Sequence, residues 1–74
     1  MRRVEVDSTS IAAIGYDSQR RVLEIEFRQS GQVYRYFNVP GEDYAALMAA
    51  ESKGSYLNQI FKRRGYRYVI VEEA

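Results

Sequence analysis

The chain contains no cysteine, no histidine and no tryptophan. Without cysteine and histidine it can form no disulfide, offers no thiol nucleophile and lacks the usual zinc ligands. General acid–base chemistry would then require two carboxylates facing each other in a cleft. The neighbouring acidic pairs are Glu24 with Glu26, expected on an open strand face, and Glu42 with Asp43, expected in the first turn of a helix. We therefore expect no enzymatic activity, no metal and no cofactor.

Long apolar runs are equally absent. No segment approaches the ~20 consecutive apolar residues that a membrane helix needs, and residues 1–7 have no apolar core of signal-peptide length. These absences predict a cytoplasmic protein with no membrane partner. With 74 residues, of which 46% are apolar, the chain is expected to fold as one small domain spanning residues 1–74.

The net charge of +1 conceals an uneven distribution along the chain. Residues 1–51 hold six basic and eight acidic side chains. Residues 52–71 hold no acidic residue and five basic ones, which are Lys53, Lys62, Arg63, Arg64 and Arg67. Residues 72–74 are an acidic tail. A basic block of this kind suits a polyanion, although it is also typical of a solvated helix end.

Alternation of apolar and polar residues predicts strands over residues 11–16, 22–27 and 33–37, with residues 2–6 as a short edge strand. In the first of these strands Ala12, Ile14 and Tyr16 share a face. The strand over 22–27 alternates most clearly, and its two glutamates are expected to point to solvent. Pro40 ends the last of these strands, because proline has no N–H to donate to a ladder.

Tyr34 and Tyr36 lie on one face of the strand over 33–37. If Ser30 and Gly31 are the two central residues of the preceding turn, the facing pairs are Phe27 with Tyr34, Ile25 with Tyr36 and Glu26 with Arg35. This register places both tyrosines on the apolar face, whereas a one-residue slip would bring Arg35 to the core. Core packing is therefore favoured for the two tyrosines, and a platform for stacking bases is the alternative.

After Pro40 the apolar period changes from two to 3.6. A first helix is expected to extend as far as Glu51, and Gly54 is expected to interrupt it. Ser55 is expected to cap a second helix that ends at Gly65. The buried faces of the two helices are Tyr44, Leu47 and Met48 in the first, and Tyr56, Leu57, Ile60 and Phe61 in the second. With a final strand over 66–71, the predicted fold is α+β: a small antiparallel sheet in β-β-β-α-α-β order, with two short helices packed on one face.

Four segments occur together and in a characteristic order: Ser10–Asp17, Leu23–Phe27, Val33–Pro40 with its Tyr-x-Tyr centre, and Ser52–Asn58. With these segments the chain resembles the KTSC domain, a family named for the C-terminus of certain lysyl-tRNA synthetases. The resemblance covers residues 8–68 and implies a stand-alone module of bacterial or phage type, for which RNA binding is suggested. Relatives often carry a proline between aromatic and basic residues near the end, where this chain has Arg64-Gly65-Tyr66-Arg67-Tyr68.

The best functional candidate in the sequence is the basic and aromatic segment 62–68. Its cations could hold backbone phosphates and its tyrosines could stack on unpaired bases. The residues predicted to bind nucleic acid are Lys53, Lys62, Arg63, Arg64, Tyr66, Arg67 and Tyr68. Four neutralised phosphates would give a log–log salt slope of roughly −3 on single strands. The structural alternative is a helix C-terminus that attracts cations, followed by a half-buried strand.

A purely structural or self-associating domain is one interpretation of these features, and two functions that involve a partner are the others. The first is a non-enzymatic small domain that binds RNA, either tRNA or a single strand. The second is an accessory module that binds a translation-associated or phage-associated protein and no nucleic acid. An unpaired edge of the sheet could accept a strand of that protein partner. The turn Ser52–Ser55 is favoured as a helix cap rather than an anion site, because it lacks the longer glycine-framed run of a P-loop. Asn58 is likewise favoured as a structural side chain.

Overall fold

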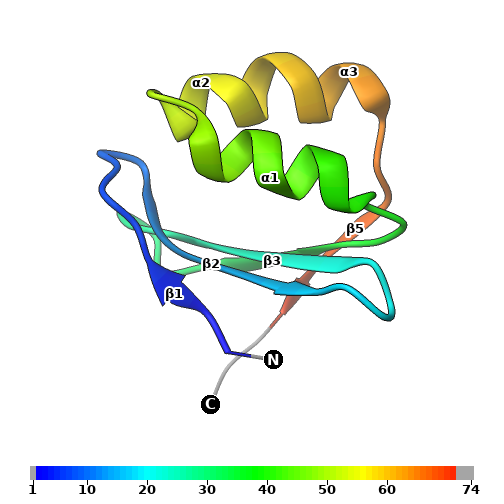
Figure 1. Ribbon diagram of the computed structural model, residues 1–74. Helices are drawn as coiled ribbons and strands as arrows, with labels where there is room; N and C mark the ends of the chain where they lie inside the picture. The colour runs from blue at the N-terminus through cyan, green and yellow to red at the C-terminus, as the bar shows by residue number, and fades with distance from the viewer. Residues whose placement is uncertain (1, 72–74) are drawn as a thin grey trace.

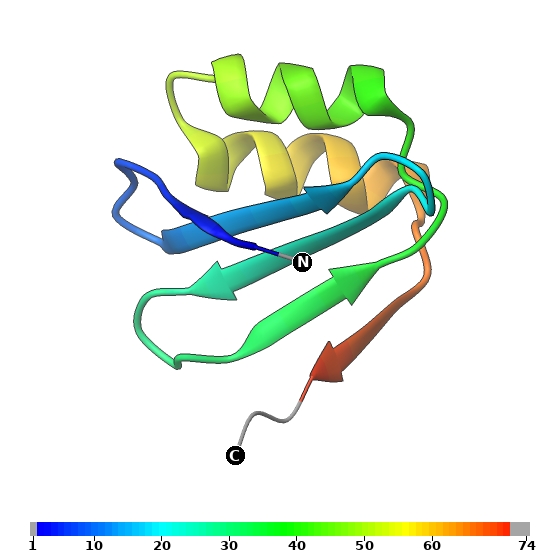
Figure 2. The ribbon, with the colours of Figure 1, turned by 60° about the horizontal axis from the view of Figure 1, so that its bottom comes forward.

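The structure, a computed structural model, describes residues 2–71. Within these residues five antiparallel strands form one sheet, and each strand pairs with its neighbour in the sequence. The strands are β1 (Val4–Glu5), β2 (Ile11–Asp17), β3 (Val22–Phe27), β4 (Val33–Tyr36) and β5 (Tyr68–Val71). Two helical segments cover one face of the sheet (Figure 1). The predicted α+β fold is confirmed, and β1 and β5 are the two edges of the sheet (Figure 2).

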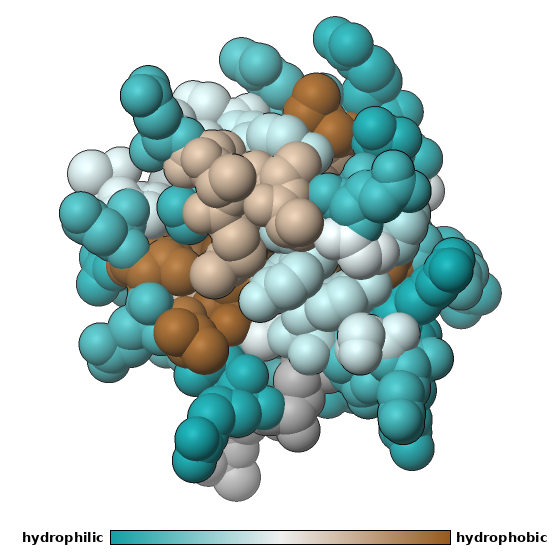
Figure 3. All heavy atoms as spheres, viewed as in Figure 1, coloured by the Kyte–Doolittle hydropathy of each residue, from teal (hydrophilic) through white to brown (hydrophobic). Residues whose placement is uncertain are grey.

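Helix α1 spans Gly41–Ala49, and a second helix runs without a break from Lys53 to Arg64. The second helix has three parts, which are α2 (Lys53–Tyr56), the π-helical η1 (Leu57–Phe61) and α3 (Lys62–Arg64). Moderately apolar side chains gather over α1 on its outer side (Figure 3), where its exposed alanines add helix propensity rather than core contacts. None of the helices within residues 2–71 is long and apolar enough to cross a bilayer.

The link between the two helices differs from the prediction. Ala50 is extended, so α1 ends before Glu51. The N-cap of α2 is Ser52 rather than Ser55, because the Ser52 hydroxyl accepts a hydrogen bond from the Ser55 N–H at 3.3 Å. Gly54 lies inside α2 instead of interrupting a helix. A Cβ at this position would collide with the Ser10 hydroxyl, so glycine here allows the helix to approach the start of β2.

The β3–β4 hairpin pairs in a register two residues away from the predicted one. Ile25 faces Tyr34, and Leu23 faces Tyr36. The turn is longer than two residues, because the Gly31 N–H donates to the Phe27 carbonyl at 2.9 Å and Gly31 takes a φ of 72°. Since the displacement is even, both tyrosines remain on the helix-covered face as predicted.

A β-bulge in β2 changes which residues of that strand reach the core. Ile11 pairs with Phe27 while Ala13 pairs with Glu26, so Ala12 is the extra residue. Ile11, and not Ala12 as predicted, therefore shares the core face with Ile14. The core lies between the sheet and the helices, and its fully buried side chains are Ile11, Ile14, Leu23, Ile25, Val39 and Leu47.

On the opposite, helix-free face of the sheet, Glu24 is only 4% exposed. The prediction of an open position was wrong, because two arginines cover this carboxylate. Arg3 donates to one of its oxygens at 2.8 Å, and Arg35 donates to the other at 2.7 Å. A Cβ at position 15 would stand 3.0 Å from Arg3 Cγ, so Gly15 leaves room for the Arg3 side chain to cross β2. Burial favours the neutral acid, but the hydrogen bonds from Arg35 and Arg3 outweigh it and lower the pKa of Glu24.

Candidate functional site

A hollow lies between the second helix and the helix-covered side of β3, β4 and β5. Its volume is about 880 Å³. We call it the aromatic cleft. The residues that line it are Thr9, Ser10, Phe27, Gln29, Ser30, Gln32, Tyr34, Tyr36, Leu57, Asn58, Phe61, Lys62, Gly65, Tyr66 and Tyr68. Apolar rings combined with a few hydroxyl, amide and ammonium groups are typical of a small-ligand site.

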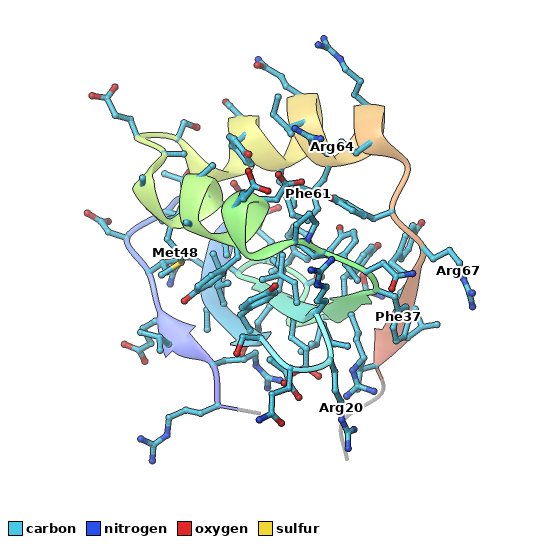
Figure 4. All side chains as sticks on the ribbon, turned by 45° about the vertical axis from the view of Figure 1, so that its right-hand side comes forward. Arg20, Phe37, Met48, Phe61, Arg64 and Arg67 are labelled. Carbon is cyan, nitrogen blue, oxygen red and sulfur yellow. The ribbon has the colours of Figure 1, made fainter. Side chains whose placement is uncertain are left out.

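Stacked and tilted rings from neighbouring strands build the floor and wall of the aromatic cleft. The rings of Tyr34 and Tyr68 stack with centroids 5.2 Å apart, and Phe27 meets Tyr34 edge-on at 5.0 Å. Tyr36 lies beneath them at 9% exposure and meets Phe61 edge-on at 5.3 Å. Phe61 projects from the second helix toward the sheet (Figure 4). The cluster therefore joins strands to helix while leaving part of its surface open.

Tyr68 is the most exposed ring of this cluster, at 54%. It stands on β5, the sheet edge that extends away from the helices (Figure 2). Alternation along β4 and β5 places Tyr34, Tyr36 and Tyr68 on the same face. None of the helices within residues 2–71 covers the β5 end of this row, and the exposed Tyr68 ring leaves the tyrosine stack open to a planar partner at this end.

The second helix contributes polar groups from its π-helical part. Leu57 and Phe61 point into the core, while Asn58 is exposed and lines the aromatic cleft beside Lys62. A π-helical turn within an α-helix is frequently found at a functional site. Asn58 thus offers an amide donor and acceptor, and Lys62 a positive charge, at the rim of an aromatic surface.

Three of the seven residues predicted to bind nucleic acid line the aromatic cleft, and they are Lys62, Tyr66 and Tyr68. Arg63 is exposed on α3 next to them. Arg64 instead makes an ion pair with the buried Asp43 of α1 at 3.1 Å. The Tyr66 hydroxyl donates to the same carboxylate. The structure therefore assigns Arg64 to the junction between α3 and α1.

Arg67 and Lys53 lie apart from the cleft. Arg67 reaches the Phe37 ring at 6.0 Å, on the helix-free side of the sheet, and the two side chains lie together at the edge of the molecule (Figure 4). Lys53 Nζ donates to the Ala50 carbonyl at 3.1 Å, which satisfies the C-terminal end of α1. The basic block of the sequence is thus divided between two faces of the fold.

Burial and hydrogen bonding raise the pKa of two tyrosines at the site. Desolvation, with the nearby hydroxyls of Tyr34 and Tyr68, raises the pKa of Tyr36 to about 12. Desolvation and the hydrogen bond to Asp43 raise the pKa of Tyr66 to about 12. Both rings therefore stay neutral across the physiological range, and they present no phenolate that would repel an anion.

Carboxylates contribute little to the chemistry of this surface. Within residues 2–71 no group of three or more Asp or Glu side chains is placed to hold a metal ion. Glu24 is neutralised by Arg3 and Arg35 on the other face of the sheet. The cleft instead combines aromatic faces, amides and one ammonium group, which suit a planar ligand that carries negative charge.

Six cleft residues come from the four segments that carry the family resemblance, namely Ser10, Phe27, Tyr34, Tyr36, Leu57 and Asn58. The sequence favoured a core position for Tyr34 and a structural role for Asn58. In the structure Tyr34 packs against the core and also lines the cleft, and Asn58 lines the cleft as well. The four segments contain these residues, but tertiary contacts bring the residues together around one hollow.

Comparison with known proteins identifies relatives over most of the chain. The family profile described as the KTSC domain matches residues 7–68. The chain is 47% identical over 68 residues to an uncharacterized protein of Stutzerimonas stutzeri, covering 92% of this chain and 94% of that one. It is 42% identical over 59 residues to a protein of Tsukamurella paurometabola, covering 80% and 87%. The crystal structure of a KTSC domain protein from Yersinia pestis matches with a TM-score of 0.88 at 35% identity, covering 96% and 97%.

Proposed function

The chain belongs to the KTSC domain family, and we propose that it binds single-stranded RNA in the aromatic cleft. The observation that carries this proposal is the open stack of Tyr34 and Tyr68, which leaves a ring face accessible beside Lys62. Unpaired bases stack on such rings whatever their identity, because every base has a π-face.

The polar residues of the cleft supply the remaining contacts of this proposal. Asn58, Gln29 and Gln32 have amides that can hydrogen-bond the edges of a splayed base. Lys62 and Arg63, on consecutive positions of α3, supply charge for the flanking phosphates. A duplex would not fit this arrangement, since its bases are already stacked and paired. An association of the family with certain lysyl-tRNA synthetases, implied by the resemblance, agrees with an RNA ligand.

The structure revises the expected salt dependence. Arg64 is paired with Asp43, and Arg67 lies on the other face, which leaves Lys62 and Arg63 for phosphates. Two neutralised phosphates on a single strand correspond to a log–log salt slope of about −1.4, compared with roughly −3 for all four cations. A measured slope near −1.4 would therefore favour the cleft over the whole basic segment.

Fluorescence anisotropy with a labelled single-stranded RNA and with labelled tRNA tests the proposal. Lys62→Glu should weaken binding of the single strand and reduce the slope, while the matched control Arg20→Glu should leave binding unchanged. Arg20 is a suitable control because its side chain is 84% exposed and lies outside the cleft. Binding that is equally strong in Lys62→Glu, or absent in the wild type at low salt, would overturn the proposal. In the second case capture of a protein partner after nuclease treatment would favour the accessory-module alternative.

A further inference from the structure

The two edges of the sheet are protected very differently. β1 has only two residues, one of them Glu5, and charged residues flank it on both sides. Arg28 reinforces that edge by donating to the carbonyls of Val6, Ser8 and Ile11. Short, charged strands of this kind are how soluble proteins prevent edge-to-edge pairing.

The β5 edge carries no charge within the strand itself and is twice as long as β1. Its sequence Tyr-Val-Ile-Val contains no charge and no proline. Tyr68, Val69 and Ile70 are 54%, 46% and 48% exposed. Among residues 2–71 no strand pairs with the outer side of β5. An uncharged edge with apolar side chains on both faces is a template for another strand.

The backbone of β5 has the hydrogen-bonding pattern that such pairing requires. The Phe37 N–H donates to the Arg67 carbonyl at 2.9 Å, which identifies the pair of residues 37 and 67 as hydrogen-bonded. In an antiparallel ladder, hydrogen-bonded pairs alternate with pairs that are not hydrogen-bonded. The pair of Arg35 and Val69 is therefore hydrogen-bonded as well, and Val69 directs its N–H and C=O toward β4. The N–H and C=O of Tyr68 and of Ile70 consequently point outward, away from the sheet.

We propose that two copies of this chain pair antiparallel through β5, about a two-fold axis that passes beside Val69. Tyr68 of each copy then faces Ile70 of the other, and their outward N–H and C=O groups exchange hydrogen bonds. Val69 faces Val69 of the second copy at a position without hydrogen bonds. The axis is normal to the sheet, so the two sheets join and both helical layers lie on the same side.

Self-complementarity identifies the occupant as a second copy rather than an unrelated strand. The central pairs are apolar on both faces of the joined sheet, since Tyr68 faces Ile70 on one face and Val69 faces Val69 on the other. In the sequence, Arg67 precedes the strand, and Glu72 and Glu73 follow it. Antiparallel pairing sets the basic end of one strand against the acidic end of the other, which favours this direction over the parallel one.

Single cysteines test the geometry directly, since the native chain has none. Facing residues without mutual hydrogen bonds have Cα atoms about 4.5 Å apart, within the range of a disulfide. Oxidised Val69→Cys should therefore become a covalent dimer. The matched control is Val71→Cys, because Val71 faces Arg67 of the second copy and the two cysteines would be roughly 13 Å apart along the strand. Crosslinking of Val71→Cys as readily as Val69→Cys would overturn the arrangement.

Sedimentation of the full chain over a range of concentrations provides the second test. Wild type should shift from monomer to dimer as concentration rises, Val69→Lys should remain monomeric, and Val4→Lys should behave as wild type. Val4 is the matched control because it is 55% exposed on the opposite edge. Circular dichroism verifies that both variants are folded. A wild type that stays monomeric throughout, or a Val4→Lys variant that loses the dimer equally, would overturn the proposal.

Tyr68 takes part in both proposals, through its backbone in the dimer and through its ring in the aromatic cleft. Val69 faces away from the cleft, so Val69→Cys tests the dimer separately from the RNA site. In the dimer the two aromatic clefts lie on the same face of the joined sheet. The two Tyr68 rings are then diagonal neighbours across the two-fold axis. Failure of the crosslink would leave the Lys62→Glu experiment unaffected.

Discussion

The rings of Tyr34 and Tyr68 lie 15° from parallel with their centroids 5.2 Å apart. They are diagonal neighbours, because Tyr34 faces Ile70 and Tyr68 faces Tyr36 in the β4–β5 ladder. Diagonal neighbours on one face of a sheet are within reach when the side chains are aromatic. This stack turns the sheet edge into a continuous aromatic surface beside the second helix.

Removal of the exposed ring should weaken RNA binding. Tyr68→Ala removes one stacking surface, which is worth about 1–3 kcal/mol and corresponds to a roughly 5- to 150-fold loss of affinity. Tyr68→Phe should bind almost as wild type, because stacking needs the ring and not the hydroxyl. The matched control is Phe37→Ala, an aromatic on the helix-free face. Anisotropy titrations of the three variants with the same single strand give the comparison, and equal losses for Phe37→Ala and Tyr68→Ala would contradict the assignment of the site.

The Arg3–Glu24–Arg35 cluster should be a major source of stability on the helix-free face. Glu24→Gln retains the shape but leaves two arginines without their counter-charge, and we expect the free energy of unfolding to fall by about 1.5–3 kcal/mol. Glu26→Gln is the matched control. Its side chain is 36% exposed and its distance to Arg3 is 3.4 Å, so it should cost less than about 1 kcal/mol. Urea unfolding monitored by tyrosine fluorescence measures both.

The same cluster predicts an acid limit of stability. The pKa of Glu24 is lowered from its ordinary value of 4.5. A carboxylate with a lowered pKa contributes stability that is fully present above 4.5 and is lost as the pH falls below it. Wild type should therefore lose stability below pH 4.5 more steeply than Glu24→Gln, which has no proton to take up at this position. Identical acid profiles for the two proteins would show that Glu24 does not act in this way.

An alkaline limit should follow from two tyrosines. The pKa values of Tyr36 and Tyr66 are both raised from 10.0 to about 12. The folded state therefore holds these protons more tightly than the unfolded chain does, and stability that is present below pH 10 is lost as the pH rises toward 12. Absorbance at the phenolate band should show Tyr36 and Tyr66 ionising late, together with unfolding. In Tyr66→Phe the late absorbance change should be smaller, because the contribution of Tyr66 is lost.

Gly54 and Ser10 should be energetically coupled. Glycine to alanine inside a helix normally stabilises by up to about 1 kcal/mol. In the wild-type background Gly54→Ala should gain less than this or destabilise, because the new methyl group meets the Ser10 hydroxyl. In a Ser10→Ala background the obstruction is gone and the usual gain should return. A double-mutant cycle measured by thermal unfolding gives the coupling, and strictly additive effects would exclude the contact.

The local pattern of the sequence was sufficient to predict most elements. Alternation of period two located β2 and β3, and the change of period after Pro40 located both helices, since each depends on neighbouring residues only. The turn between these two strands is also local, because the Asp17 carboxylate accepts from the N–H groups of Gln19 and Arg20. The placement of Tyr34 and Tyr36 on the helix-covered face also followed from the alternation, because successive side chains of a strand point to opposite faces of the sheet.

Tertiary structure alone decided the register, the burial of charge and the composition of the cleft. The β3–β4 register depends on a turn whose closure requires Gly31 at a positive φ, and the short-range pattern was equally compatible with a two-residue turn. Glu24 is buried because Arg3, twenty-one residues away, crosses over Gly15 to reach it. Tertiary contacts also divide the basic block, because Arg64 forms an ion pair with Asp43 and Arg67 lies against the Phe37 ring. The contacts of Arg3, Arg64 and Arg67 join segments that are distant in the sequence. Residue order specifies which side chains are available but not which of them meet.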